Sequence, residues 1–560
     1  MANVVNPSSP GLNESSSGTL GTWSWVLAAI AFAALPYGLC HLGLDMTDSP
    51  YHLNNASHFK RFAPTVLSYW VIGKWREVVG PSLMATRYFA VLLLQLAGLI
   101  VLAAVQAPLR RKAAAFAAIS LFISTRYYIA LGYDEVSTLF LAATLASLIR
   151  AISTHGAASR LWVAMAGLAS AGAILARLPN CLVAGVCVLA LFMLACRDKW
   201  RLSWAMAILP ALYITAMLLA WSACLAAIYG GIGQACATFV QNLSGLNSSY
   251  GLINLLVNYA VHTIILFWWL GLALLAETGF KWTERLRHRT HLTLLALTGV
   301  VILFIGSLLL RISPYFPDMA LLLFVVMGFH SRDVLRAQWL VRKGVSVDGV
   351  LIATVLLFSL IPVAGSNTGL LKLGSGLYLP VVSAVYWPRI ARATRLLAIS
   401  AGLTAVLCIP AQRLMAQYED APAHLTRSTV DHPRLKGIFT TPQRKTFIEA
   451  VLQDVETQTE TPLFVGKLRH GFEFLVDADF GCSRNFWSDL DDPSYVRQVQ
   501  DALQDRRPES VYIVPQYEND VLPPTNNGVE ALLNDQGYQL GISDKSFRRY
   551  NRLSSGTRAQ

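Results

Sequence analysis

A succession of long apolar runs is the feature of this sequence that most constrains its fold. A helix needs about twenty apolar residues to cross the hydrocarbon core of a bilayer. Runs that approach or exceed this length recur between residues 22 and 413, so we predict an α-helical polytopic membrane protein with about thirteen spans. The predicted spans are 22–44, 83–106, 113–131, 135–152, 160–176, 179–196, 202–229, 252–277, 291–311, 317–330, 346–364, 376–390 and 396–413.

The composition divides the chain into regions of different character. Charged residues make up only 14% of the 560 residues, whereas a soluble domain carries about a quarter. The deficit comes from residues 22–413, while residues 414–560 have an ordinary soluble composition. Residues 1–21 lack the basic region of a signal peptide, so we predict a disordered cytoplasmic tail followed by an uncleaved first span.

Lysine and arginine alternate between loops in a way that predicts the orientation. With the N-terminus in the cytoplasm, the cytoplasmic loops hold basic clusters within 110–112, 197–201 and 281–289. The opposite short loops and their edges hold few basic residues, namely Arg126, Arg177, Arg311 and Lys372. Thirteen spans then place 414–560 on the periplasmic or extracytoplasmic side. The net charge of +12 is explained by these loops, so we predict no nucleic-acid partner.

The first outer loop, residues 45–82, is too long for a simple turn. After Pro64, apolar residues recur at helical spacing from Val66 to Val78, with Lys74 and Arg76 alongside. This pattern predicts an amphipathic helix lying in the membrane interface. The alternative is a helix packed on the bundle, and both place a folded element over the outer face.

The C-terminal region predicts a small soluble α/β domain with an open-sheet or three-layer arrangement. Thr441-Pro442 is a typical helix start, because proline is favoured at the first helical position. Further helices are predicted near 494–505 and 528–535. The predicted strands are 463–465, 472–476, 511–514 and a final strand or hairpin after residue 538. No nucleotide-binding motif is present in it.

Two carboxylates follow the first span, at Asp45 and Asp48. Acidic residues at membrane depth are costly and tend to be functional, although the cost falls at the membrane edge. They suit general-base catalysis on a hydroxyl, or a divalent cation such as Mg²⁺ or Mn²⁺. His52 and His58 are weaker metal candidates. The alternative is a solvated helix end, with Asp48 opening a turn before Pro50.

A second acidic pair, Asp134 and Glu135, is predicted at the same face, and it follows Arg126, Tyr127 and Tyr128. The pair is a candidate second acidic site or metal site. A helix N-terminus, where the macrodipole favours acids, explains it equally well.

Three basic residues stand on the side that positive charge usually avoids, namely Arg177, Arg311 and Lys372. Binding of a donor phosphate is one explanation, since a guanidinium holds phosphate oxygens bidentately. Snorkelling of long side chains to the interface is the alternative.

This layout resembles the GT-C glycosyltransferases, the class that contains protein O-mannosyltransferases and bacterial aminoarabinose transferases of lipid A. The resemblance covers the architecture of the whole membrane domain. It lies in Asp45 and Asp48 after the first span, the long first outer loop, Asp134-Glu135, the stretch Arg177-Leu178-Pro179-Asn180, and an outer C-terminal α/β domain.

The resemblance implies an inverting transferase that moves a sugar from a polyprenyl-phosphate donor to an extracytoplasmic glycan, lipid or protein at the cell inner membrane. An acid of the first outer loop serves as base in that class. It would be Asp45 or Asp48, with Asp48 favoured because it lies further outside the bilayer. Arg177 and Arg311 would contact the donor phosphate.

Other functions fit many spans as well. A transporter or flippase predicts charged or broken helices near the midplane and internal repeats, whereas the acids here cluster at the outer rim. A glycan polymerase or ligase shares polyprenyl substrates but usually carries its large soluble part between spans. A non-catalytic scaffold remains a further alternative, because motifs this short have false positives.

Overall fold

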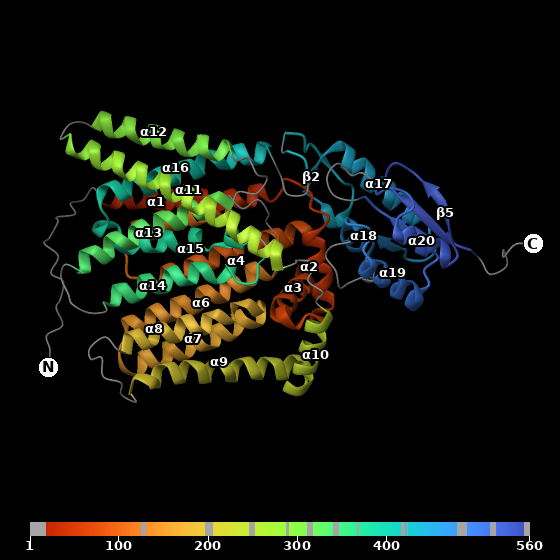
Figure 1. The fold of residues 1–560 in the computed structure, drawn as a ribbon, viewed down its shortest axis with the longest axis horizontal. Helices are drawn as coiled ribbons and strands as arrows, with labels where there is room; N and C mark the ends of the chain where they lie inside the picture. Colours follow the sequence, from red (N-terminus) through yellow and green to blue (C-terminus); the bar gives the residue numbers. More distant parts are fainter. Residues whose placement is uncertain are drawn as a thin grey trace, which may run out of the picture.

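The computed structural model describes residues 18–124, 130–195, 205–245, 252–286, 290–310, 317–339, 346–366, 369–415, 420–422, 424–478, 490–515 and 522–553. A bundle of long, roughly aligned helices occupies most of the molecule. A mixed α/β region formed by the C-terminal part of the chain caps one end of the bundle (Figure 1).

Every predicted span corresponds to a helix among the described residues. These helices are α1 (Gly18–Leu39), α4 (Leu83–Ala104), α5 (Leu109–Ser124), α6 (Tyr133–Ser153), α7 (Gly156–Ala176), α8 (Leu182–Ala195), α9 (Ala205–Tyr229), α11 (Leu252–Arg285), α12 (Thr290–Leu309), α13 (Pro317–Trp339), α14 (Val347–Leu360), α15 (Ser375–Tyr386) and α16 (Arg392–Met415). Over the described residues, 8 helices are long and apolar enough to cross a membrane. The protein is therefore a multi-pass membrane protein, and crossing by all thirteen stays a prediction.

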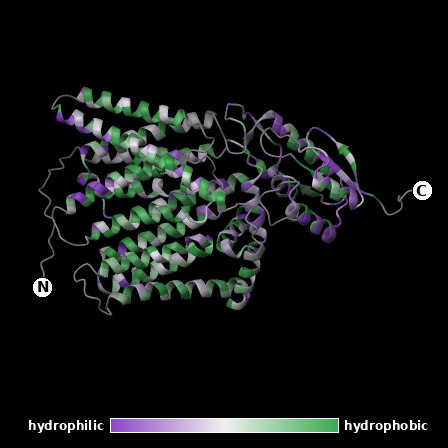
Figure 2. Ribbon diagram, in the orientation of Figure 1, coloured by the Kyte–Doolittle hydropathy of each residue, from purple (hydrophilic) through white to green (hydrophobic). Residues whose placement is uncertain are grey.

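The helices turn apolar side chains both inward and outward, as a bilayer requires. Leu219, Leu275 and Leu295 on α9, α11 and α12 are 66%, 67% and 70% exposed. Figure 2 shows the bundle helices as mostly hydrophobic and the C-terminal region as more polar. Inside, small residues allow close approach: a Cβ on Gly167 of α7 would lie 2.5 Å from the carbonyl oxygen of Tyr213 on α9.

Three helices outside the predicted spans gather at the end of the bundle that the C-terminal region caps (Figure 1). They are α2 (Asp48–Ser57), α3 (Val66–Val79) and α10 (Ile232–Gly245). The helix predicted after Pro64 is α3, and it packs on the bundle: Ser68 donates to the carbonyl of Ala176 at 2.9 Å. Its outer face carries exposed apolar side chains at Trp70 and Val78, which also suits a membrane interface.

Short 3-10 helices occur at several bends of the chain. They are η1 (Phe59–Arg61), η2 (Ala63–Thr65), η3 (Leu178–Cys181), η4 (Ile361–Val363), η5 (Gly369–Lys372), η6 (Trp387–Arg389) and η7 (Pro433–Leu435). Five of them, η2, η3, η4, η6 and η7, carry a proline at the first or second position, where no backbone N–H is needed. Two of them, η4 and η5, carry part of the candidate site.

The C-terminal region contains a four-stranded mixed sheet in the order β3-β4-β6-β5, with β3 and β4 parallel and the other neighbours antiparallel. Its elements are β1 (Ser428–Thr429), β2 (Phe439–Thr440), α17 (Pro442–Glu456), β3 (Leu463–Val465), α18 (Arg469–Val476), α19 (Pro493–Arg506), β4 (Ser510–Ile513), α20 (Gly528–Asp535), β5 (Tyr538–Ser543) and β6 (Arg548–Arg552). The prediction of a mixed α/β region at the C-terminal side of the membrane helices is confirmed.

One element of this region was predicted wrongly. Residues 472–476 are a short, mostly apolar run of the kind a buried strand has, yet they form part of helix α18. Phe472, Glu473, Phe474 and Leu475 are all buried, because α18 lies between the sheet and α2. An element buried on every side has no polar face, so its periodicity cannot distinguish helix from strand.

Candidate functional site

Asp45 lies between the first span and helix α2, and its side chain binds the start of that helix. One of its carboxylate oxygens accepts from the backbone N–H of Thr47 at 2.7 Å, from the Thr47 hydroxyl at 2.7 Å and from the N–H of Asp48 at 3.2 Å. The other oxygen accepts from the N–H of Ser49 at 2.7 Å. The side chain is buried, so Asp45 satisfies the free N–H groups that begin helix α2.

Asp48 is the first residue of α2 and is only half-buried. Its place at a helix N-terminus favours the ionised carboxylate. Its charge acts on Tyr51 of the same helix and on Tyr69 of α3. Of the two acids, Asp48 is therefore the more accessible, whereas the oxygens of Asp45 are engaged by four donors.

His52 lies one turn further along α2 and connects this loop to the bundle. Its Nδ1 is 3.1 Å from the Tyr69 hydroxyl, and its ring meets that of Tyr133 edge-on, with centroids 5.3 Å apart. The surrounding protein lowers the pKa of His52 to about 4, because burial disfavours the imidazolium more than the Asp134 charge supports it. His52 is therefore neutral at physiological pH. Burial likewise raises the pKa of Tyr51 to about 12.

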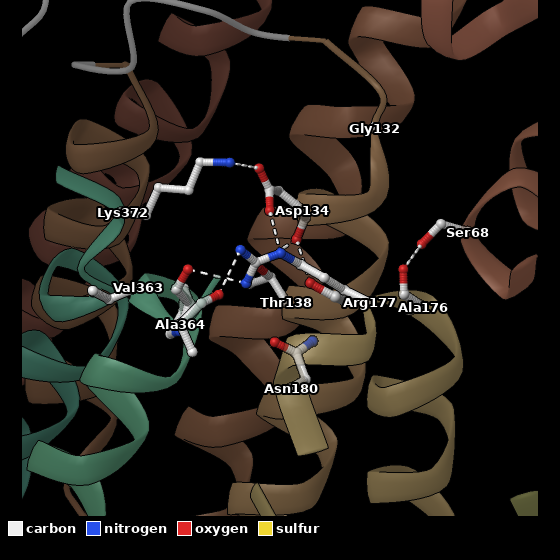
Figure 3. Close-up of polar contacts among 12 residues, drawn as sticks. Ser68, Gly132, Asp134, Thr138, Ala176, Arg177, Asn180, Val363, Ala364 and Lys372 are labelled. Carbon is white, nitrogen blue, oxygen red and sulfur yellow. Dashed lines mark hydrogen bonds and ion pairs between the residues drawn. The ribbon is translucent and has the colours of Figure 1, made fainter. Parts of the chain in front are cut away.

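Asp134, at the start of α6, is shared by two cations that come from distant parts of the chain (Figure 3). The Lys372 ammonium lies 2.5 Å from one carboxylate oxygen, and Nε of Arg177 lies 3.5 Å from the other. Three residues selected individually from the sequence thus form one cluster. With two cations to one carboxylate, the cluster is suited to an additional anionic group.

Within this cluster Arg177 is the buried member. Its terminal nitrogens donate to the carbonyls of Pro362 and Ala364, both at 3.0 Å, so it ties the end of α7 to the turn after α14. The side chain is 5% exposed. Two carbonyl acceptors and one carboxylate around a single guanidinium make it a fixed structural cation.

Lys372 is the more accessible cation, with 26% of its side chain exposed. Burial disfavours its ammonium, but the charge of Asp134 outweighs that effect, and the pKa of Lys372 is raised. The ammonium also lies 5.5 Å from the centre of the Tyr133 ring. Lys372 therefore stays charged and reaches toward the aromatic side chains around His52.

Glu135 has a local role in the same turn. Its carboxylate accepts from the backbone N–H of Gly132 at 3.0 Å, which caps the start of α6. Gly132 packs closely against α2, since a Cβ there would lie 3.1 Å from the His52 ring. Glu135 is buried and points into its own turn, so it supports the loop beside Asp134.

The C-terminal region covers this group of side chains through α18. The ring of His470 lies 5.1 Å from that of Tyr51, and Asn54 donates to the His470 carbonyl at 3.1 Å. Burial, followed by the charge of Arg469, holds the pKa of His470 well below its usual range. The candidate site thus lies between the bundle end, the first outer loop and the C-terminal region.

Sequence reasoning found the charged residues of this site but missed most of the uncharged ones. Tyr69, Tyr133 and His470 carry no local signal, because each lies in an ordinary helix and becomes relevant only through its neighbours. Arg311 and Arg126 lie outside the described residues.

The described part of the chain contains no group of three or more His, Cys, Asp or Glu side chains placed to hold a metal ion. His52 faces tyrosines and Asp45 faces backbone N–H groups, so neither supplies free donors to a cation site. We therefore derive no step through a divalent cation.

No protein-family model matches this sequence, and no curated protein sequence matches it. Among solved structures, it is similar to ArnT from Cupriavidus metallidurans bound to undecaprenyl phosphate, at 14% identity and a TM-score of 0.43 over 96% of this chain and 99% of that one. It is also similar to the Archaeoglobus fulgidus oligosaccharyltransferase. With zinc and sulfate, that protein gives 11% identity and a TM-score of 0.48 over 88% of this chain and 67% of that one. In its apo form, the same protein gives 12% identity and a TM-score of 0.45 over 89% of this chain and 70% of that one.

The likeness to these two proteins extends over most of this chain, in keeping with the architecture expected from the sequence. At these identities and TM-scores it says nothing about substrates, so the functional argument rests on the residues of this chain.

Proposed function

We propose that this protein is a glycosyltransferase that moves a sugar from a polyprenyl-phosphate donor to an acceptor hydroxyl at the outer membrane face. One observation carries the proposal. The ring of Tyr133 lies 5.3 Å from that of His52, which is one turn along α2 from Asp48, and its centre lies 5.5 Å from the Lys372 ammonium that pairs with Asp134. An accessible carboxylate and a cation-rich cluster thus converge at one end of a membrane bundle, where a lipid phosphate resides.

In the proposed reaction, the acceptor hydroxyl attacks the anomeric carbon and gives its proton to the Asp48 carboxylate. The bond between the anomeric carbon and the phosphate oxygen breaks, and its electron pair leaves with the polyprenyl phosphate. Attack opposite the leaving group inverts the anomeric centre. Lys372 stabilises the charge on the departing phosphate, and Arg177 with Asp134 keeps Lys372 in place.

The neutral side chains shape the space between the acid and the cation. His52 and Tyr69 are hydrogen-bond partners without net charge, so they suit the hydroxyl groups of a sugar. The cover formed by α18 limits access of water, which would otherwise compete with the acceptor hydroxyl.

The orientation of the protein is part of the proposal. The ends of α7 and α14 and the starts of α6 and α15 come together around Arg177, Asp134 and Lys372, as alternating spans require. Basic residues concentrate in the loops of the other end. We therefore propose a cytoplasmic N-terminus for the membrane domain 22–413 and a periplasmic or extracytoplasmic domain from residue 414 to 560.

The test is turnover in proteoliposomes. A panel of undecaprenyl-phosphate hexoses and pentoses would be supplied with total envelope lipid and glycan as acceptor, and release of undecaprenyl phosphate would be measured by mass spectrometry. Wild-type protein should release it from at least one donor, and Asp48→Asn should not. If the protein moves labelled lipid between leaflets with the sugar still attached, a transporter or flippase is the better description. Joining of repeat units would indicate a polymerase or ligase.

A further inference from the structure

We infer that the C-terminal region sets the position of Asp48, with Arg444 and Asp420 acting as positioning residues. The structure shows the underlying contacts directly, and the catalytic consequence rests on the proposed function. The acid-bearing segment, residues 44–54, is held by this region at its beginning, its middle and its end.

At the beginning of the segment, an ion pair from the C-terminal region forms hydrogen bonds with both backbone polar groups of Leu44. The Leu44 N–H donates to Asp420 at 2.6 Å, and Arg444 donates to the Leu44 carbonyl at 3.1 Å. Arg444 and Asp420 lie 3.7 Å apart, with 9% and 1% of their side chains exposed. Leu44 directly precedes Asp45, so the pair fixes the chain where it turns from the first span toward α2.

The pairing also extends backward along the chain. The Gly43 N–H donates to the Phe439 carbonyl at 3.0 Å, and the Phe439 N–H donates to the His41 carbonyl at 2.8 Å. Leu42 and Phe439 form a parallel β-bridge. Residues 41–44 are thus paired to a strand of the C-terminal region and cannot shift independently of it.

The middle and end of the segment meet α18. A Cβ on Gly471 would lie 2.8 Å from the carbonyl oxygen of Met46, so the two backbones are in direct contact. Further along, the Asn54 side chain donates to the His470 carbonyl at 3.1 Å. These two contacts lie on either side of Asp48 in the chain. They restrict the movement of Asp48 as long as α18 stays in place.

A cover that merely rested on the membrane domain would contact exposed side chains. Here the contacts involve backbone groups of the acid-bearing segment and buried charges that would be costly to leave unpaired. The C-terminal region therefore forms part of the site and determines where its carboxylate stands relative to Lys372.

The experiment compares Arg444→Met and Gly471→Ala with a control in the same region, Arg548→Met. The control breaks another buried ion pair, between Arg548 and Glu530 at 2.9 Å, but does not touch residues 44–54. Hydrogen exchange is followed at the amides of Thr47, Asp48 and Ser49, which Asp45 protects. We expect the two test variants to exchange about tenfold faster there and the control to remain unchanged. Unchanged exchange in both test variants would overturn the inference.

Turnover supplies the second readout. Both test variants should lose about ten- to a hundredfold in kcat, with the KM for the undecaprenyl-phosphate sugar nearly unchanged, because Lys372 is left intact. The control should retain kcat. A loss of kcat that follows thermal stability equally in all three variants would contradict a positioning role. If wild-type protein transfers no sugar, the proposed function fails, while the exchange experiment still decides whether the C-terminal region fixes the segment.

Discussion

The two ends of the helical bundle use similar charged residues in different surroundings. At the end opposite the C-terminal region, Glu277 of α11 pairs with Lys281 at 2.9 Å and with Arg332 of α13, which also pairs with Asp333. Asp348 of α14 pairs with Arg389 at 2.7 Å and accepts from Tyr386 at 2.9 Å. Acids and bases are balanced in these groups, and each joins neighbouring helices.

The end that the C-terminal region caps, called the capped end below, differs in its balance of charges and in being covered by another part of the chain. Asp134 faces two cations, the neutral His52 ring contacts Tyr69 and Tyr133, and α18 packs against the adjoining helix α2. Glu277 is about 27 Å along α11 from Tyr259, which contacts the turn beside Arg177, so the two groups of charges are far apart. We propose that the excess of cations beneath a partial cover forms a binding site, whereas the balanced ion pairs of the other end join helices.

The largest expected effect is the loss of sugar transfer when Asp48, the accessible acid of the capped end, is replaced. Asp48→Asn should reduce sugar transfer by about 10²–10⁴-fold, the usual contribution of a general base, with little change in thermal stability. Asp45→Ala should instead lower stability by about 1–2 kcal/mol, because the first N–H groups of α2 lose their acceptor. Turnover and thermal unfolding of both variants check this. The opposite pattern would make Asp45 the base.

The next prediction compares one cation from each end, the half-buried Lys372 and the exposed Arg389. Lys372→Ala should raise the KM for the donor by about 10–100-fold, the worth of a charge-assisted hydrogen bond to phosphate. Arg389→Ala, which removes an exposed pair at the other end, should change stability by less than about 1 kcal/mol and leave the KM unaltered. Equal effects on KM would remove the distinction between the two ends.

Removing an ion pair that joins two helices at the opposite end, such as Glu277–Arg332, should affect stability alone. Arg332→Met should cost about 1–2 kcal/mol, since Glu277 is buried but retains Lys281. The transfer rate per folded molecule should not change. Thermal unfolding combined with turnover checks this, and a selective loss of kcat would show that the end opposite the C-terminal region also takes part in the reaction.

The smallest effect concerns pH. The pKa of His52 is about 4 in the fold and about 6.5 in an unfolded chain, so the unfolded state binds more protons between these values. The stability from His52 is therefore present above pH 6.5 and is lost as pH falls toward 4, by about 1 kcal/mol at pH 5.5. His52→Gln should flatten thermal stability between pH 7 and 5.5. Replacement of the exposed His155 by Gln should not.

The same comparison shows what the sequence could predict. Spans and most C-terminal elements follow from local periodicity and from signals such as Thr441-Pro442, and the structure confirms them as helices and strands. Helix α2 escaped prediction because its polar sequence has no apolar stripe, and α18 because it is buried on every side.

The candidate site was predictable only residue by residue. The sequence marks Arg177 and Lys372 as basic residues on the side that positive charge usually avoids, and Asp134 as part of an acidic pair at the same face. Their meeting could not be predicted, because Lys372 and Asp134 are 238 residues apart in the chain. The pairing of Leu44 with Asp420, 376 residues away, depends on tertiary packing in the same way.

Binding of lipid phosphate tests the central claim most directly. Native mass spectrometry of detergent-purified protein with added undecaprenyl phosphate would be run on wild type, Lys372→Ala and Arg389→Ala. The account predicts one retained undecaprenyl phosphate on wild type and Arg389→Ala, and loss of that adduct from Lys372→Ala. No adduct on the wild type, or equal adducts on all three proteins, would contradict a lipid-phosphate site at the capped end.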